Sequence, residues 1–188
     1  MRGAIYYATK YGSTGQYAHW ISVATELPVH DIAKDAPDLS DYDFLVIGCP
    51  VLYHRLMFHK WVKRNAAIIK SKPTILFTVS GAGPGSKLDD WIASSLPADV
   101  VLHVRHFALK GRQDPKKLTF MDRTMLIIAG LLNRDKSVAR DELQGFDYMD
   151  KSSIAPIVEH IERLKQMEGR RDPLTWRRIG KKQLSKGS

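Results

Sequence analysis

Short apolar runs, separated by stretches with a helical pattern, constrain the fold of this chain more than any other feature. The runs Phe44–Gly48 and Thr74–Val79 place apolar residues at nearly every position instead of alternating them with polar ones. Strands of this kind are buried on both faces, which happens when helices cover both sides of a parallel sheet. The sequence therefore predicts an α/β fold with a doubly wound, five-stranded parallel sheet.

The predicted strands and helices alternate along the chain. The strands are Gly3–Ala8, Val29–Ile32, Phe44–Gly48, Thr74–Val79 and Val100–Phe107, and the helices are Ser13–Glu26, Leu56–Lys70, Ser86–Ser95 and Ser152–Gln166. With 188 residues the chain can form one domain around one sizeable core. Because ligands of doubly wound sheets bind at the carboxyl ends of the strands, the loops after the strands are the candidate site.

The turn after the first strand places hydroxyl groups where the first helix begins. Thr9, Ser13 and Thr14 surround Gly12, so hydroxyls, backbone N–H groups and a helix N-terminus meet at one point. The lysine of a Walker loop and the three spaced glycines of a dinucleotide fingerprint are both missing from this turn. The pattern favours a phosphomonoester site, and a simple Thr/Ser N-cap is the alternative.

Two further loops follow strands at the same predicted edge of the sheet. The segment Pro50–Tyr53 places an aromatic side chain after the third strand, and Ser80–Gly85 places three glycines after the fourth. Glycines permit close approach of the backbone to a planar ligand, and Tyr53 can stack on a flat ring. We therefore expect a planar ligand between these loops. The first loop, with Thr9, Ser13 and Thr14 around the phosphate and no arginine, resembles the FMN-phosphate loop of the flavodoxin superfamily, which implies a flavin ring here, with His54 close enough to hydrogen-bond to flavin or substrate.

Cys49 and Arg55 offer a second interpretation of the third loop. Their separation matches that of a phosphatase loop, in which a thiolate attacks a phosphate held by backbone amides and an arginine. Pro50 has no N–H group to contribute to such a loop. The sequence therefore disfavours this chemistry and favours Cys49 as a small core residue.

Several segments carry a specific resemblance. Together with the first loop, the segments Val46–Tyr53, Phe58–Arg64, Phe120–Met125 and Phe146–Asp150 resemble the flavodoxin-domain family, and within it the menaquinone-dependent protoporphyrinogen IX dehydrogenases. The resemblance covers about residues 1–166. It implies a flavodoxin-like fold, non-covalent FMN, and oxidation of protoporphyrinogen IX to protoporphyrin IX with a quinone as electron acceptor.

The resemblance also implies site residues, position by position. The cofactor contacts carried over to this chain are Thr9, Lys10, Tyr11, Gly12, Ser13, Thr14, Pro50, Val51, Leu52, Tyr53, Ser80, Gly81, Ala82 and Gly83. A positively charged cleft suits the two propionates of a tetrapyrrole, and the candidate substrate contacts are His54, Arg55, Lys110 and Arg112. No side chain stands out as a catalytic acid or base. No metal site is expected either, because the histidines show no ligand spacing supported by acids.

The net charge of the chain helps to distinguish an enzyme from an electron-transfer protein. The formal net charge is +9, whereas a carrier flavodoxin presents an acidic face to basic partners. The loop Ser80–Gly85 contains no aromatic residue, so we expect one face of the flavin to be open to a flat substrate. An enzyme is the favoured class, and an electron-transfer protein, an FMN-dependent quinone reductase or a flavin-binding module is the alternative.

Two segments exceed the minimal fold of the FMN-binding domain, which is predicted to cover residues 1–168. The insertion 110–150 includes Lys116–Leu132, which is amphipathic in its first half and then nearly all apolar. This segment predicts a helix on the sheet edge, beside a substrate cleft or on a membrane surface. Residues 169–188 hold seven Lys and Arg residues and one Asp, and are predicted to be a flexible tail. Such a tail can bind anionic lipid, whereas a nucleic-acid partner is not expected. The expected location is the cytoplasm, with peripheral membrane contact, and a homo-oligomer remains open.

Overall fold

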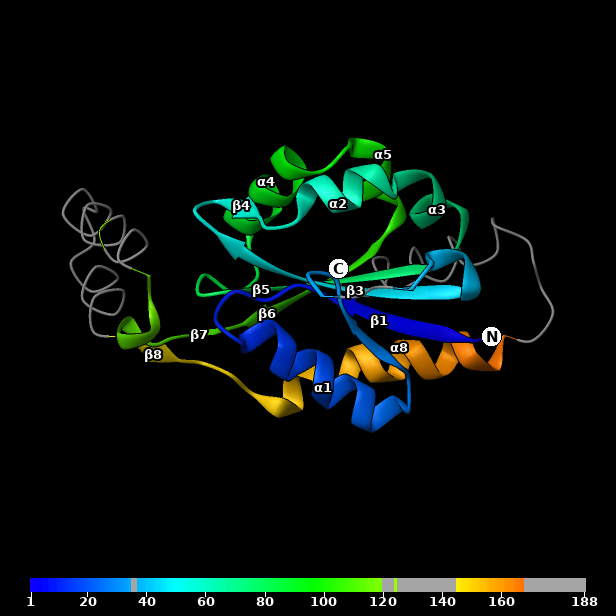
Figure 1. Ribbon diagram of the computed structural model, residues 1–188, viewed down its shortest axis with the longest axis horizontal. Coiled ribbons are helices and arrows are strands. Elements are labelled where there is room, and N and C mark those ends of the chain that lie inside the picture. Colours follow the sequence, from blue (N-terminus) through cyan, green and yellow to red (C-terminus); the bar gives the residue numbers. More distant parts are fainter. Residues whose placement is uncertain (35–36, 120–123, 125–144, 168–188) are drawn as a thin grey trace, which may run out of the picture.

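A parallel five-stranded sheet forms the centre of the computed structural model, which describes residues 1–34, 37–119, 124 and 145–167 (Figure 1). In spatial order, its strands are β2 (Val29–Asp31), β1 (Gly3–Tyr7), β3 (Phe44–Leu52), β5 (Thr74–Ser80) and β6 (Arg105–Lys110). All neighbouring pairs in this order are parallel. A short strand, β4 (Arg55–Leu56), pairs antiparallel with the end of β3. The predicted α/β fold and the five-stranded parallel sheet are confirmed.

Helices cover both faces of the sheet (Figure 1). One face carries α1 (Ser13–Thr25) and α8 (Ala155–Gln166), and the other carries α2 (His59–Arg64), α3 (Ala66–Ser71), α4 (Ser86–Ser95) and α5 (Ala98–His103). Successive strand residues point to opposite faces, so Ile5 and Val46 join the core under α1 and α8, whereas Ala4 and Leu45 join the core on the other face. This explains why the strands are apolar at consecutive positions.

The predicted strand Val100–Phe107 is wrong in its first half. Residues Ala98–His103 form helix α5, and the strand begins only at Arg105. In this helix Val100 and His103 are buried while Leu102 is 87% exposed, which is the spacing of a helix with one buried face. The β-branched residues of this segment favoured a strand locally, but packing against the sheet decided for a helix.

The predicted helix Leu56–Lys70 is also corrected. Leu56 belongs to β4, Met57 and Phe58 form a turn, and the residues from His59 onward form two short helices that meet at Asn65. Phe58, directly before α2, has a φ of 58°, so a single continuous helix cannot run through this point. The third strand is longer than predicted, since β3 continues through Pro50 to Leu52.

The insertion begins and ends in a small antiparallel ribbon. Strand β7 (Arg112–Gln113) pairs with β8 (Phe146–Asp147), so residues far apart in sequence lie side by side. Pro115–Lys117 form a 3-10 turn. Most of the helix predicted at Lys116–Leu132 lies outside the described residues, as does the tail 169–188. Within the described part, 3-10 turns also occur at Leu39–Asp41 and Lys151–Ile154.

None of the helices in the described ranges combines the length and apolar character needed to cross a membrane.

Candidate functional site

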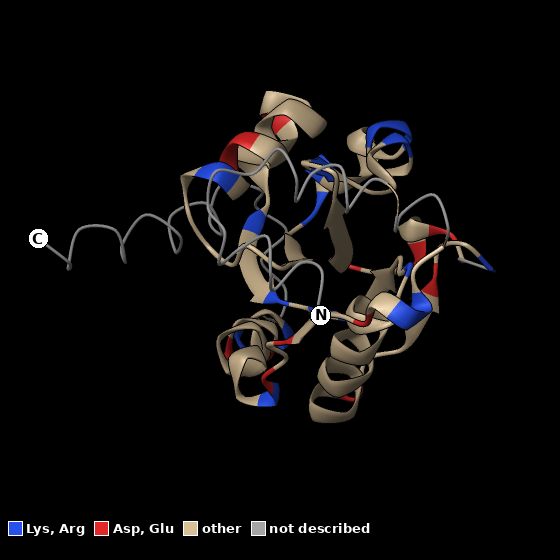
Figure 2. Cartoon of the chain, turned by 90° about the vertical axis from the view of Figure 1, so that its left-hand side faces the viewer, with Lys and Arg blue, Asp and Glu red and all other residues tan. Residues whose placement is uncertain are grey.

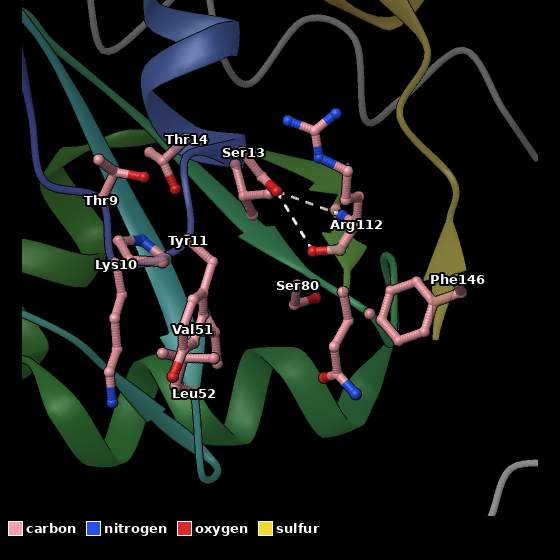
Figure 3. Close-up of a pocket in the computed structure, with 15 residues that line it drawn as sticks. Thr9, Lys10, Tyr11, Ser13, Thr14, Val51, Leu52, Ser80, Arg112 and Phe146 are labelled. Atoms are coloured by element: carbon pink, nitrogen blue, oxygen red, sulfur yellow. Dashed lines mark hydrogen bonds between the residues drawn. The ribbon is translucent and has the colours of Figure 1, made fainter. Parts of the chain in front are cut away.

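An open pocket lies where strands β1, β3, β5 and β6 end (Figure 3). This is the edge of the sheet at which ligands of doubly wound folds bind. Its lining residues come from the three predicted loops and from the ribbon of β7 and β8. They are Thr9, Lys10, Tyr11, Ser13, Thr14, Pro50, Val51, Leu52, Val79, Ser80, Gly81, Gly111, Arg112, Gln113 and Phe146.

The turn between β1 and α1 leaves the start of the helix available to a ligand. Gly12 stands at the N-cap with a φ of 91°, a conformation that glycine adopts without strain. Its N–H group donates to the Thr9 hydroxyl at 3.0 Å, which closes the turn. Among the described residues no side chain caps α1, and the first N–H groups of a helix have no acceptor within it. Together with the positive end of the helix dipole, these groups suit an anion.

Two buried hydroxyl groups in the pocket have no hydrogen-bond partner within the described part of the chain. They belong to Thr14, which is 1% exposed, and to Ser80, which is 6% exposed. A buried hydroxyl without a partner costs about 1–3 kcal/mol, so such groups normally have a partner. Since both residues line the pocket, a polar ligand bound there can supply it.

Ser13 has a different role from Thr14 in this pocket. Its hydroxyl donates to the Arg112 carbonyl and accepts from the Arg112 N–H, each at 3.3 Å (Figure 3). The start of α1 is thereby tied to the start of β7.

The charged groups in the pocket wall are both cationic. Lys10 and Arg112 are the charged lining residues among those the structure describes, and no acid joins them. The Lys10 ammonium group lies 5.5 Å from the ring centre of Tyr11 and 5.9 Å from that of Tyr53. Arg112 lies 4.0 Å from the Asp147 carboxylate, and both side chains are largely exposed. Lys and Arg residues and Asp and Glu residues both occur on many parts of the described chain (Figure 2), so the lack of acids among the described lining residues is a local feature of the pocket wall.

Some residues implied by the resemblance lie outside the pocket wall. Among the cofactor contacts, these are Gly12, Tyr53, Ala82 and Gly83. Tyr53 and His54 form the tight turn between β3 and β4, with φ values of 53° and 59°. Tyr53 is half exposed. Its predicted stacking on a flavin ring stays a prediction.

Three of the candidate substrate contacts also lie elsewhere, and only Arg112 is in the pocket wall. The His54 ring stacks on Trp91 of α4, with 4.7 Å between ring centres. Arg55 is exposed on β4. The Lys110 side chain passes beside Gly83, and its ammonium group lies 5.5 Å from the ring centre of Tyr148. The hairpin turn thus directs the His54 ring to α4, and its contact with flavin or substrate stays a prediction.

Phe146 is the most informative lining residue that the sequence interpretation did not place in the site. A Cβ atom on Gly81 would lie 2.7 Å from the Phe146 ring, so ring and glycine backbone are in direct contact. Figure 3 shows Phe146 beside Ser80, across from the end of β3. The ribbon therefore places an aromatic ring in the pocket wall beside the loop Ser80–Gly85, which itself has none, and the expectation of one flavin face open to a flat substrate stays a prediction. Val79, Gly111 and Gln113 also line the pocket, and no local pattern marked them.

Cys49 cannot act as a phosphatase nucleophile. It lies within β3 and is fully buried, and burial raises the pKa of its thiol to about 12. The thiol therefore stays protonated at neutral pH, and thiolate chemistry is excluded. In the described ranges, no three His, Cys, Asp or Glu side chains gather in a way that could hold a metal ion.

By structure, the chain is similar to several flavoproteins. A flavoprotein from Lactobacillus acidophilus NCFM in complex with FMN matches at 11% sequence identity over 58% of this chain and 91% of that chain, with a TM-score of 0.45. Oxidised flavodoxin 2 from Bacillus cereus matches at 16% identity over 69% and 97%, with a TM-score of 0.45. A flavodoxin, WrbA-like protein from Agrobacterium tumefaciens matches at 16% identity over 75% and 98%, with a TM-score of 0.43.

A comparison with curated proteins finds no match. The sequence model of the flavodoxin domain, however, matches residues 4–136. This segment is more than half of the chain and includes β1, the turn to α1, and the ends of β3, β5 and β6. The chain therefore belongs to the flavodoxin-domain family.

Proposed function

We propose that this protein binds FMN in the pocket and acts as an FMN-dependent oxidoreductase. The observation that carries the proposal is the buried, unpartnered Thr14 hydroxyl beside the uncapped start of α1. Hydroxyl and N–H groups at a helix N-terminus match a phosphate, and the family membership of the chain agrees with a flavin phosphate. The structure of the Lactobacillus flavoprotein was solved in complex with FMN.

In this proposal, the phosphate and the ring of FMN contact different lining residues. Thr14 and the first N–H groups of α1 would hold the phosphate, with Lys10 adding positive charge. The end of β3 with Pro50–Leu52, the backbone of Gly81 and the Phe146 ring would border the flavin ring. When bound, FMN supplies hydride and electron transfer, and the protein supplies position and electrostatics.

Within this function, we propose protoporphyrinogen IX as the substrate and a quinone as the electron acceptor. The proposal rests on the sequence resemblance and on a pocket wall whose charged side chains are both cations, which favours a flat substrate with carboxylates. An electron-transfer protein or an FMN-dependent quinone reductase is the alternative. These alternatives predict different electron donors, so one experiment separates them.

Anaerobic mixing of the FMN-loaded protein with protoporphyrinogen IX is expected to reduce the flavin, and a quinone is expected to reoxidise it. Absorbance at the flavin band measures both steps. If the flavin stays oxidised with protoporphyrinogen IX but exchanges electrons rapidly with a small redox protein, the protein is a carrier. If NADH or NADPH reduces it and a quinone reoxidises it, the quinone reductase is the correct alternative.

Arg112 and Arg55 form a matched pair for testing the substrate cleft. Arg112 lines the pocket and Arg55 does not. Arg112→Gln is expected to raise the KM for protoporphyrinogen IX about tenfold, the size of one lost charge-assisted hydrogen bond. Arg55→Gln is expected to leave it unchanged. Equal effects of the two substitutions on KM would contradict the placement of the substrate at Arg112.

We also propose that residues 169–188 bind an anionic membrane surface on the cytoplasmic side. The seven basic residues of this segment are expected to contribute roughly 1 kcal/mol each near anionic lipid. Removing the segment should abolish sedimentation with phosphatidylserine vesicles and leave the flavin spectrum unchanged, with phosphatidylcholine vesicles as the control. Binding that survives truncation, or that does not weaken with salt, would reject this role of the tail.

A further inference from the structure

Tyr17 joins three segments of the chain beneath the pocket. It lies on α1 one turn after Ser13 and is fully buried. Its hydroxyl donates to the Lys110 carbonyl at 2.8 Å and accepts from the Asp150 N–H at 3.0 Å. Lys110 ends β6, where the insertion leaves the sheet, and Asp150 lies where the chain returns to α8. One hydroxyl therefore holds both ends of the insertion against the helix that begins at the pocket.

Other hydrogen bonds tie the same ends of the insertion to the pocket. The Gly111 N–H donates to the Ser80 carbonyl at 2.8 Å, and the Tyr148 N–H donates to the Gly111 carbonyl at 3.1 Å. Arg112 is held by the Ser13 hydroxyl. We call residues 110–113 and 145–150 the stem of the insertion.

The stem forms one side of the pocket. Gly111, Arg112, Gln113 and Phe146 all line it. Phe146 contacts the backbone of Gly81 and stacks on Tyr148, with ring centres 4.8 Å apart and planes 15° from parallel. The position of this aromatic wall therefore depends on where the stem is held.

We propose that Tyr17 is a positioning residue of the cofactor site: by holding the stem closed, its hydroxyl places Phe146 and Arg112 against the pocket. A tyrosine hydroxyl can donate and accept a hydrogen bond at once. Phenylalanine at this position would remove both hydrogen bonds, the one to the Lys110 carbonyl and the one from the Asp150 N–H. Binding and stem closure are then linked, and the linkage is reciprocal: FMN stabilises the closed stem, and the closed stem strengthens FMN binding. This inference rests on the proposed FMN function.

Hydrogen exchange of the FMN-free protein tests the positioning role without FMN. Tyr17→Phe is expected to speed amide exchange at Gly111, Arg112 and Tyr148 about tenfold, because the stem opens more often. The control is Ser22→Ala, which removes another α1 hydroxyl whose bond, to the Leu27 carbonyl at 2.7 Å, stays outside the stem. It should leave these amides unchanged. If the stem amides of Tyr17→Phe exchange at the same rate as those of the wild type, the proposal is overturned.

The affinity for FMN tests the link to the site. Tyr17→Phe is expected to raise the Kd for FMN about tenfold, and Ser22→Ala is expected not to change it. In a Phe146→Ala background, the effect of Tyr17→Phe should shrink to about threefold or less, because the hydroxyl acts partly through Phe146. An equal effect in both backgrounds would contradict positioning of this ring.

The wild-type chain provides a measurement that does not depend on how well the variant folds. FMN at about a hundred times its Kd should slow exchange of the Arg112 and Asp150 amides at least tenfold. The Glu26 amide, bonded to the Ser22 carbonyl at the other end of α1, should not respond. Unprotected stem amides in the FMN complex would reject the linkage alone, whereas failure of the wild type to bind FMN would reject the proposed function.

Discussion

Replacing Ser13 and Thr14 together by alanine is expected to weaken FMN binding at least about a hundredfold. The lost hydrogen bond from Thr14 to a charged phosphate costs about 1.5–3 kcal/mol, which by itself accounts for most of this change in the Kd. The Ser13 change also releases Arg112, whose backbone the Ser13 hydroxyl holds at 3.3 Å. Titration of the FMN-free protein with FMN, followed by flavin fluorescence, measures the change.

A single substitution separates the contribution of Thr14 from that of Ser13. Thr14→Val keeps the shape of the side chain and removes only the hydroxyl, so it isolates the unpartnered group. Thr25→Val is the matched control, because Thr25 is equally buried on α1 but its hydroxyl donates to the Ile21 carbonyl at 2.7 Å, away from the pocket. An unchanged Kd for FMN in the double variant would mean that the phosphate does not bind at the start of α1. If Thr25→Val weakens FMN binding as much as Thr14→Val does, the weaker binding comes from general destabilisation of the protein.

The largest effect on stability is expected from Gly48→Ala. Gly48 on β3 is paired with Phe77 on β5, and a Cβ atom at this position would overlap the buried Phe77 ring. Since close-packed neighbours leave the ring no room to move, we expect a loss of about 3 kcal/mol in the free energy of unfolding. Urea denaturation followed by circular dichroism measures it.

A second substitution tests the cause of that loss. Phe77→Leu removes the overlapping ring atoms, so Gly48→Ala should cost at least about 1 kcal/mol less in this background than in the wild type. A loss below about 1 kcal/mol for Gly48→Ala alone would mean that the ring yields easily. Equal costs in the two backgrounds would mean that the destabilisation does not come from the Phe77 ring.

Much of the fold follows from the sequence because neighbouring residues carry the information. Consecutive apolar positions in β1, β3 and β5 require burial on both faces, and only a sheet with helices on both sides provides it. The hydroxyl-rich turn Thr9–Thr14 is similarly local, since strand, turn and helix follow each other directly. Local patterns failed at Ala98–His103, where packing against the sheet prevailed over strand propensity.

Part of the pocket wall also follows from the sequence. The loops after three parallel strands meet at one edge of the sheet, so Thr14, Val51 and Ser80 could be assigned to one site from their order alone. The side chains of a tight turn are different. The left-handed conformation of Tyr53 and His54 decides where they point, and it directs His54 to Trp91 on α4.

The sequence by itself determined the α/β fold class with a five-stranded parallel sheet, and it predicted the edge of the sheet at which the pocket lies and the hydroxyl-rich first loop, because each depends on residues adjacent in the chain. Only the tertiary structure decided that Phe146 contacts Gly81 and that Tyr17 holds both Lys110 and Asp150. These contacts join residues separated by long stretches of chain. Periodicity describes which face of an element is buried, whereas the distant residue that meets this face depends on how the whole chain packs.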